Sequence, residues 1–134
     1  ERASRRLFSR LEWLQREHPG RTVAIVTGGE YSCPVVGDGV GGRNQAFVLG
    51  CVPAIAGRAI AVLSAGTDGV DGVSPAAGAV ADGATLARAT RLGLDPADYA
   101  RRSDSYGFFS RLGDALVTGP TGNNVRDLRL LVQW

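Results

Sequence analysis

The chain has 134 residues, 44% of them hydrophobic, and a formal net charge of +2 at pH 7. This length fits one domain, and the apolar content excludes a chain that is disordered throughout. No apolar stretch reaches the roughly 18 residues that a membrane helix needs, and the charge is too small to indicate nucleic acid. We therefore expect no membrane partner, no nucleic-acid partner and a cytoplasmic location.

The absence of some residue types limits the functional groups that this chain can use. All 15 basic residues are arginine, so no lysine is present to clamp phosphate or to act as a base. Methionine is also absent, and Glu1 lies inside a helical pattern. We expect residues 1–134 to form a single domain that is a piece of a longer protein. Cys33 and Cys51 are far apart in the sequence and form no C-x-x-C pair, which predicts two buried thiols and no zinc site.

The apolar pattern predicts alternating helices and strands. Helices follow from apolar residues that recur every three or four positions, and strands from short continuous apolar runs. In chain order, we predict a helix at 3–17, strands at 22–27 and 31–36, a helix at 44–55, a strand at 59–63, helices at 83–92, from 96 and from 103 or 104, and strands at 115–118 and 128–132. Continuous apolar strands are typical of a sheet covered on both faces. The predicted class is α/β, as a three-layer α/β/α sandwich with a mostly parallel or mixed sheet.

Glycine-rich polar loops follow three predicted strands, after Thr27, Leu63 and Thr118. In open α/β sheets, ligands bind at the carboxyl ends of strands. These loops are therefore the first candidates for function.

The first loop contains Gly37, Gly39 and Gly42, which formally match the G-x-G-x-x-G pattern of dinucleotide sites. The match is weak, because Pro34 interrupts the preceding strand and no acidic residue follows at the required distance. A second interpretation is an anion site, in which a helix N-terminus offers backbone donors and Arg43 grips carboxylate or phosphate. An arginine exposed after an ordinary turn is the equal alternative.

The second and third loops also have two interpretations each. Thr67, Asp68 and Asp71 follow a buried strand, where paired aspartates can hold Mg²⁺ directly or through water. Asp-Gly is equally a favoured turn pair. The loop at 118–124 lacks the Gly-Lys-Ser/Thr of a Walker loop, but its glycines, hydroxyls and amides suit phosphate oxygens or hydroxyl groups. A purely structural loop is its alternative.

Several short motifs occur together in a fixed order: GGE at 28–30, GGRNQ at 41–45, LSAGTDGVDG at 63–72, AAGAVADG at 76–83, DSYGFF at 104–109 and TGPTGNNVRDL at 118–128. In this order they resemble the MOFRL domain, the C-terminal domain of type 2 glycerate kinases, often labelled hydroxypyruvate reductases. The family enzymes are phosphotransferases that use ATP and Mg²⁺ to phosphorylate D-glycerate. The resemblance implies that this chain supplies half of a cleft whose other half, with a catalytic lysine, is a missing N-terminal α/β domain.

The resemblance also implies roles for individual residues. Arg43 is expected to be catalytic, and Asp68 and Asp71 are the expected metal ligands. The expected substrate-binding residues are Gly41, Gly42, Asn44, Thr67, Asp68, Gly119, Thr121, Gly122 and Asn123. Three positions depart from the family pattern, namely Val40, Ala46 and Ser103, and together they suggest an altered substrate choice.

Two other functions remain open at this point. One is a stand-alone domain that binds a hydroxy acid or phosphate without chemistry. The other is an NAD(P)-dependent hydroxypyruvate reductase that uses the glycine turn.

Overall fold

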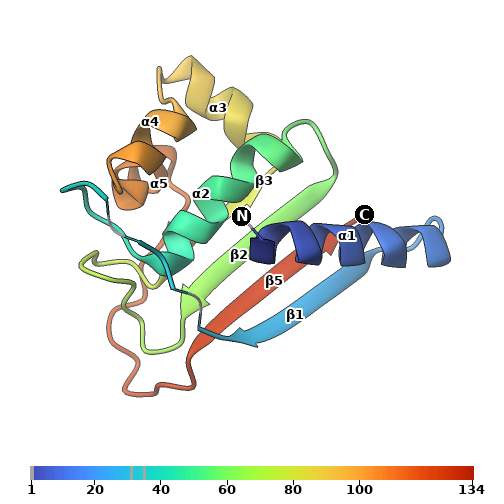
Figure 1. Cartoon of the computed structure of the whole chain (residues 1–134), viewed down its shortest axis with the longest axis horizontal. Coiled ribbons are helices and arrows are strands. Elements are labelled where there is room, and N and C mark those ends of the chain that lie inside the picture. Colours follow the sequence, from blue (N-terminus) through green and yellow to red (C-terminus); the bar gives the residue numbers. More distant parts are fainter. Residues whose placement is uncertain (1, 31, 35) are drawn as a thin grey trace.

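The computed structural model describes residues 2–30, 32–34 and 36–134. Its centre is a five-stranded sheet in the order β1-β5-β2-β3-β4 (Figure 1). The strands are β1 (Val23–Gly29), β2 (Ile60–Gly66), β3 (Gly78–Asp82), β4 (Ala115–Leu116) and β5 (Asp127–Gln133). Every neighbouring pair is antiparallel. The α/β class is confirmed, but the predicted parallel or mixed sheet is wrong.

The position of β5 explains this difference. β1 and β2 run in the same direction, as two strands of a parallel sheet would, but the C-terminal strand lies between them and pairs with both. The antiparallel partner of each strand is therefore distant in sequence, and local apolar patterns do not reveal it.

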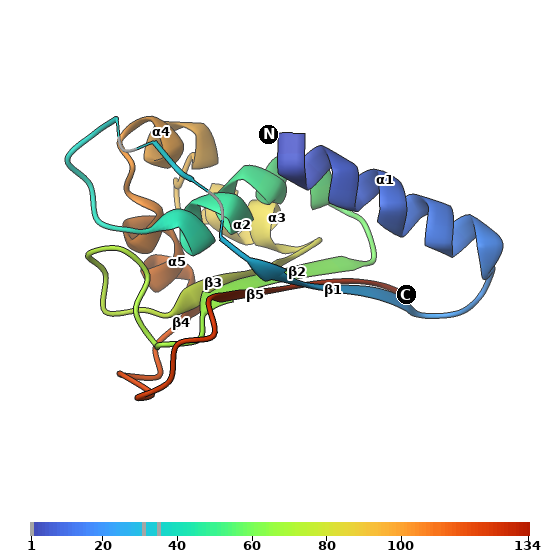
Figure 2. The ribbon, with the colours of Figure 1, turned by 60° about the horizontal axis from the view of Figure 1, so that its bottom comes forward.

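Five helices cover one face of the sheet (Figure 2). They are α1 (Arg2–Glu17), α2 (Arg43–Ile55), α3 (Thr85–Arg91), α4 (Pro96–Arg101) and α5 (Ser105–Leu112). The described residues thus form two layers, and the predicted third layer is absent from them. On the other face, aliphatic side chains alternate with the buried ones, as in the paired row Val26, Leu130, Leu63 and Val80. Val26 is 66% exposed, so an apolar run here does not mean burial on both faces.

The core lies between α2 and the sheet. α2 contributes Val48, Cys51, Val52 and Ile55, all with no exposed surface, and α5 contributes two phenylalanines in edge-to-face contact. Burial raises the pKa of the Cys51 thiol to about 12. Cys51 is buried as predicted, whereas Cys33 is exposed.

Most predicted elements are confirmed, with two differences. β3 was missed because its small residues lack a strand-like apolar pattern; it forms by pairing with β2 and packing under α2. The strand predicted at 31–36 lies partly outside the described residues, and positions 32–34 and 36 are not in a strand. α2 extends to Ile55 and contains Pro53 in its last turn.

The three glycine-rich loops do meet at one end of the sheet. β1, β2 and β4 run in the same direction, so the loops that follow them emerge together, beside the start of β5. The loops therefore lie at the same end although the sheet is antiparallel. No helix of the described residues is long and apolar enough to span a bilayer.

Candidate functional site

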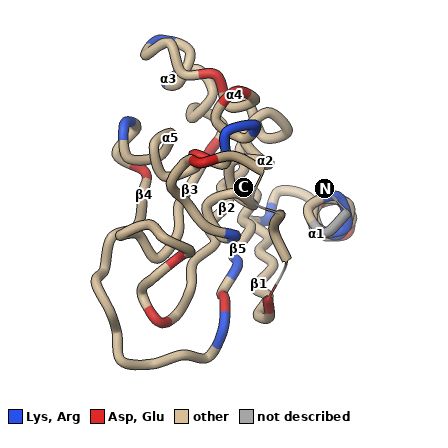
Figure 3. Tube along the Cα trace, turned by 60° about the vertical axis from the view of Figure 1, so that its left-hand side comes forward, with Lys and Arg blue, Asp and Glu red and all other residues tan. Residues whose placement is uncertain are grey.

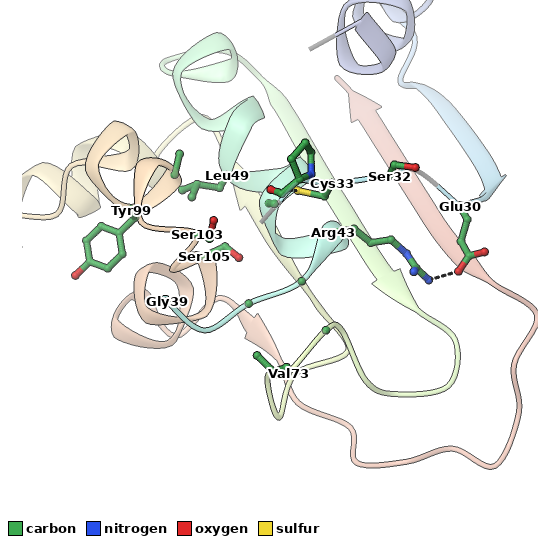
Figure 4. Close-up of a pocket in the computed structure, with 16 residues that line it drawn as sticks. Glu30, Ser32, Cys33, Gly39, Arg43, Leu49, Val73, Tyr99, Ser103 and Ser105 are labelled. Carbon is green, nitrogen blue, oxygen red and sulfur yellow. Dashed lines mark hydrogen bonds and ion pairs between the residues drawn. The ribbon is translucent and has the colours of Figure 1, made fainter. Parts of the chain in front are cut away.

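Arg43, the first residue of α2, lies between two carboxylates. Its Nε donates to Asp127 Oδ2 at 2.7 Å and its Nη2 to Asp127 Oδ1 at 3.0 Å, which is a two-pronged side-on pair. The same Nη2 lies 2.6 Å from Glu30 Oε1, at the end of a pocket (Figure 4). The Arg43 side chain is 39% exposed, so the fixed guanidinium remains accessible to a ligand.

Asp127 is the first residue of β5 and is itself buried beside a second arginine. Arg129 Nη2 donates to Asp127 Oδ2 at 3.1 Å, and neither side chain has exposed surface. Arg129 also donates to the Gly29 carbonyl and stacks against Phe47. Burial alone would raise the pKa of Asp127, but hydrogen bonds from Arg43 and Asn44 and the charges of Arg43 and Arg129 outweigh it and lower that pKa. The hydrogen bond to Asp127 in turn raises the pKa of Arg43. Charged residues of both signs gather here, around the start of β5 (Figure 3).

Asp71 closes the N-terminus of α2. Its Oδ1 accepts from the backbone N and Nδ2 of Asn44, and its Oδ2 accepts from the backbone N and Nε2 of Gln45, at 2.8–3.2 Å. The helix has no side-chain cap of its own because residue 42 is glycine; a Cβ there would lie 2.4 Å from Asp71 Cγ. Asp71 thus takes the backbone donors that the anion-site interpretation reserved for a ligand.

The predicted Mg²⁺ ligands already have hydrogen-bond partners within the chain. Asp71 is 2% exposed and each of its oxygens accepts two hydrogen bonds. Asp68 Oδ1 accepts from the Val70 backbone N, which is the turn chemistry of the alternative interpretation. Within the described ranges, no three His, Cys, Asp or Glu side chains are grouped to hold a metal. A role for Asp68 and Asp71 as Mg²⁺ ligands stays a prediction.

The second and third loops are joined by threonines. Thr67 Oγ1 donates to the Arg126 carbonyl at 2.6 Å, and Thr121 Oγ1 donates to the Thr67 carbonyl at 2.6 Å. Asn123 bonds back to Thr121, while Gly119 and Gly122 adopt positive φ angles in the same loop. These contacts match the structural interpretation of the loops. A substrate-binding role for Thr67, Asp68, Gly119, Thr121, Gly122 and Asn123 stays a prediction.

A pocket of about 760 Å³ lies between residues 30, 32–34 and 39–42, α2 and α4. Of the predicted site residues, Gly41, Gly42 and Arg43 line it. Asn44 does not; it is 1% exposed and bonded to Asp71 and Ser64. Two of the three positions that depart from the family pattern, Ala46 and Ser103, also line this pocket.

The glycine turn packs against the protein itself. A Cβ at Gly37 would lie 2.3 Å from the Arg102 carbonyl oxygen, and one at Gly39 would lie 2.5 Å from Asp104 Cβ. These glycines permit close contact with the segment between α4 and α5. The dinucleotide interpretation needs a backbone open to a pyrophosphate after a strand, and the described residues before this turn are not in a strand.

The comparisons with known proteins agree with the motifs. The MOFRL family model matches residues 23–127. The chain belongs to the MOFRL family. It is 43% identical over 109 residues to the D-glycerate 2-kinase of Thermotoga maritima, covering 81% of this chain and 26% of that protein. It is 40% identical over 111 residues to a putative hydroxypyruvate reductase of Agrobacterium vitis, covering 81% of this chain and 25% of the relative.

The fold is also that of a solved MOFRL relative. The crystal structure of Thermotoga maritima glycerate kinase superposes with a TM-score of 0.90 at 38% identity, over 99% of this chain and 33% of that one. This MOFRL chain therefore spans about a quarter to a third of the length of the relatives that it matches.

Three residues of this site were not assigned a role from the sequence, namely Glu30, Asp127 and Arg129. For two of them the sequence carried a signal, because buried and more exposed positions alternate along β5. Asp127 and Arg129 lie on the same buried, helix-facing side as Leu131. Two opposite charges on the buried side of a strand indicate a buried ion pair. The contact between Glu30 and Arg43 joins the end of β1 to the start of α2 and has no local signal.

Proposed function

We propose that this chain is the C-terminal module of a glycerate 2-kinase and supplies half of the cleft in which ATP phosphorylates D-glycerate. The observation that carries the proposal is Arg43, an accessible guanidinium fixed at the end of a pocket by a buried carboxylate. The kinase names of its relatives supply the reaction class.

The reaction moves the γ-phosphoryl group from ATP to a hydroxyl oxygen of D-glycerate. A phosphorus–oxygen bond forms to the acceptor, the bond to ADP breaks, and the hydroxyl proton passes to solvent. Positioning and charge neutralisation provide most of the catalysis in such transfers. Arg43 suits both tasks, because it binds a carboxylate or a phosphoryl oxygen and its charge persists at every physiological pH.

The rest of the nucleotide site is assigned to the missing N-terminal α/β domain. This chain has no lysine and no Walker loop, and the backbone donors of Asn44 and Gln45 at the start of α2 are occupied by Asp71. ATP supplies the phosphoryl group, and Mg²⁺ is expected to arrive with ATP, because no three His, Cys, Asp or Glu side chains of the described residues are grouped to hold the ion.

A reductase has less support. A putative hydroxypyruvate reductase is among the relatives, but Gly37 and Gly39 contact Arg102 and Asp104 and leave no open cradle for a dinucleotide. Titration with NADH, followed by its fluorescence, separates the two activities. A saturable change would favour the reductase.

Turnover of the full-length enzyme that carries this domain tests the proposal. Arg43→Ala is expected to lower kcat for ATP-dependent phosphorylation of D-glycerate by about 100-fold or more, since one fixed donor to a developing charge contributes that much. Arg21→Ala is the matched control, because Arg21 is exposed and lies after α1, away from the pocket. Turnover of Arg43→Ala within twofold of the wild type would remove Arg43 from the mechanism.

A further inference from the structure

The two carboxylates that contact Arg43 differ in how deeply they are buried and in how many bonds hold them in place. The Asp127 side chain has no exposed surface, makes two bonds to the guanidinium and is held by the buried Arg129. The Glu30 side chain is 53% exposed and reaches Arg43 through a single oxygen at 2.6 Å. Removing Asp127 from Arg43 would leave buried charges uncompensated, whereas Glu30 can turn into solvent at little cost.

The guanidinium geometry shows which of its donors can serve a ligand. Arginine has a side-on edge, formed by Nε and Nη2, and an end-on edge, formed by Nη1 and Nη2. Asp127 occupies the side-on edge of Arg43. Glu30 Oε1 lies 2.6 Å from Nη2, the nitrogen that the two edges share.

We propose that Asp127 is a positioning residue that fixes the guanidinium of Arg43, and that Glu30 is a displaceable counter-ion whose place on Nη2 is taken by the anionic group of the ligand. The ligand's carboxylate or phosphoryl oxygens then contact the end-on edge through Nη1 and Nη2. The proposal rests on the proposed function for the identity of the ligand, but not for the positioning by Asp127.

The same chemical change at the two carboxylates gives opposite predictions. Asp127→Asn and Glu30→Gln each replace one carboxylate beside Arg43 by an amide. If only local charge mattered, both variants would bind anions more tightly. Under the proposal, Glu30→Gln removes a competitor and tightens binding, whereas Asp127→Asn releases the guanidinium and weakens binding.

The first measurement needs no ligand. Solvent exchange of the Arg43 Nε proton, followed by NMR on the chain, reports whether the side-on pair is intact. Asp127→Asn is expected to speed this exchange by about tenfold, the factor that corresponds to losing one charged hydrogen bond. Glu30→Gln is expected to leave it unchanged, because Glu30 does not contact Nε. Equal exchange rates in the wild type and Asp127→Asn would overturn the positioning role.

The second measurement is the affinity for D-glycerate and, separately, for inorganic phosphate. Glu30→Gln is expected to bind about two- to fivefold more tightly, the range for loss of an exposed ion pair. Asp127→Asn is expected to bind about tenfold more weakly. Tighter binding by both variants would support charge alone and overturn the proposal.

A double variant distinguishes the loss of positioning from a folding defect. Asp127→Asn combined with Arg129→Met removes both buried charges and leaves neither uncompensated. It should fold, as circular dichroism will show, yet keep the fast Nε exchange and the weak anion binding. Wild-type affinity in this double variant would overturn the positioning role.

Failure of this inference and failure of the proposed function are distinguishable. If neither the wild type nor Glu30→Gln binds either probe, the exchange of Glu30 for a ligand is overturned. Turnover of the full-length Arg43→Ala enzyme then still decides the kinase assignment.

Discussion

As whole residues, Asp71 and Asp127 are equally buried, each 2% exposed, and both lie against the first turn of α2. Asp71 accepts four hydrogen bonds from neutral amides of Asn44 and Gln45, two of them backbone donors. Asp127 accepts its hydrogen bonds from the guanidinium groups of Arg43 and Arg129. Asp71 therefore fixes where the helix begins, and Asp127 fixes where the first side chain of that helix points.

The difference teaches that the partners of a buried carboxylate decide its role. A carboxylate among amides is a cap that the backbone needs for stability. A carboxylate between two guanidiniums holds their charges in place and determines which donors remain for a ligand. Replacing each carboxylate by the isosteric amide should separate these roles.

The largest expected change in stability is that of Asp127→Asn. The fully buried Arg129 loses its counter-charge, and breaking a buried pair from one side costs about 3–5 kcal/mol. The free energy of unfolding from urea titration measures the loss. Glu30→Gln is the matched control and should change it by less than about 1 kcal/mol, since its pair with Arg43 is exposed. A loss of under 1 kcal/mol in Asp127→Asn would show that Arg129 finds another partner.

Asp71→Asn should have a smaller effect. The amide keeps one acceptor oxygen, but its NH₂ group meets donors of Gln45 or Asn44 that are left unpaired, at a cost of about 2 kcal/mol. Asp68→Asn, in the same loop, is the control, because Asp68 accepts one bond from Val70 and should lose no more than about 1 kcal/mol. Hydrogen exchange in the first turn of α2 should accelerate in Asp71→Asn alone. If both variants behave alike, the cap does not stabilise the helix.

The smallest expected effect is a pH dependence of the difference in unfolding free energy between the wild type and Asp127→Asn. The folded-state pKa of Asp127 lies below its ordinary value of 3.8, so its contribution is complete above that value. The contribution is lost as the pH falls through the lower folded-state pKa. The gap in unfolding free energy between wild type and Asp127→Asn should therefore close in strong acid, as urea titrations at several pH values will reveal. A gap that stays constant down to that range would mean that the charge of Asp127 does not stabilise the fold.

Much of the secondary structure followed from local patterns. α1, α2 and α4 lie where apolar spacing and the Asp95–Pro96 start placed them. The apolar runs at β1, β2 and β5 were identified as strands, but their direction and layering were not. Aliphatic side chains occupy both faces of these strands, so their period of two is hidden in the sequence, and β3 is made of residues too small to show a pattern.

The site was predicted in part. Arg43 and the three converging loops were expected together, and the structure brings them to one end of the sheet. The roles of Asp71 and Asp127 were not, because Asp71 bonds to Asn44 and Gln45, 27 and 26 residues away, and Asp127 bonds to Arg43, 84 residues away.

The sequence by itself determined the helices, most strands and the family motifs, and it named Arg43 as a candidate site residue, because these depend on local spacing and on residue type. Only the tertiary structure decided that β5 lies between β1 and β2. Strand pairing is set by which distant segments can bury their faces together, and no local pattern encodes that choice. The same long-range pairing places Asp127 and Arg129 beside Glu30 and Arg43, and so decides how the arginine is held.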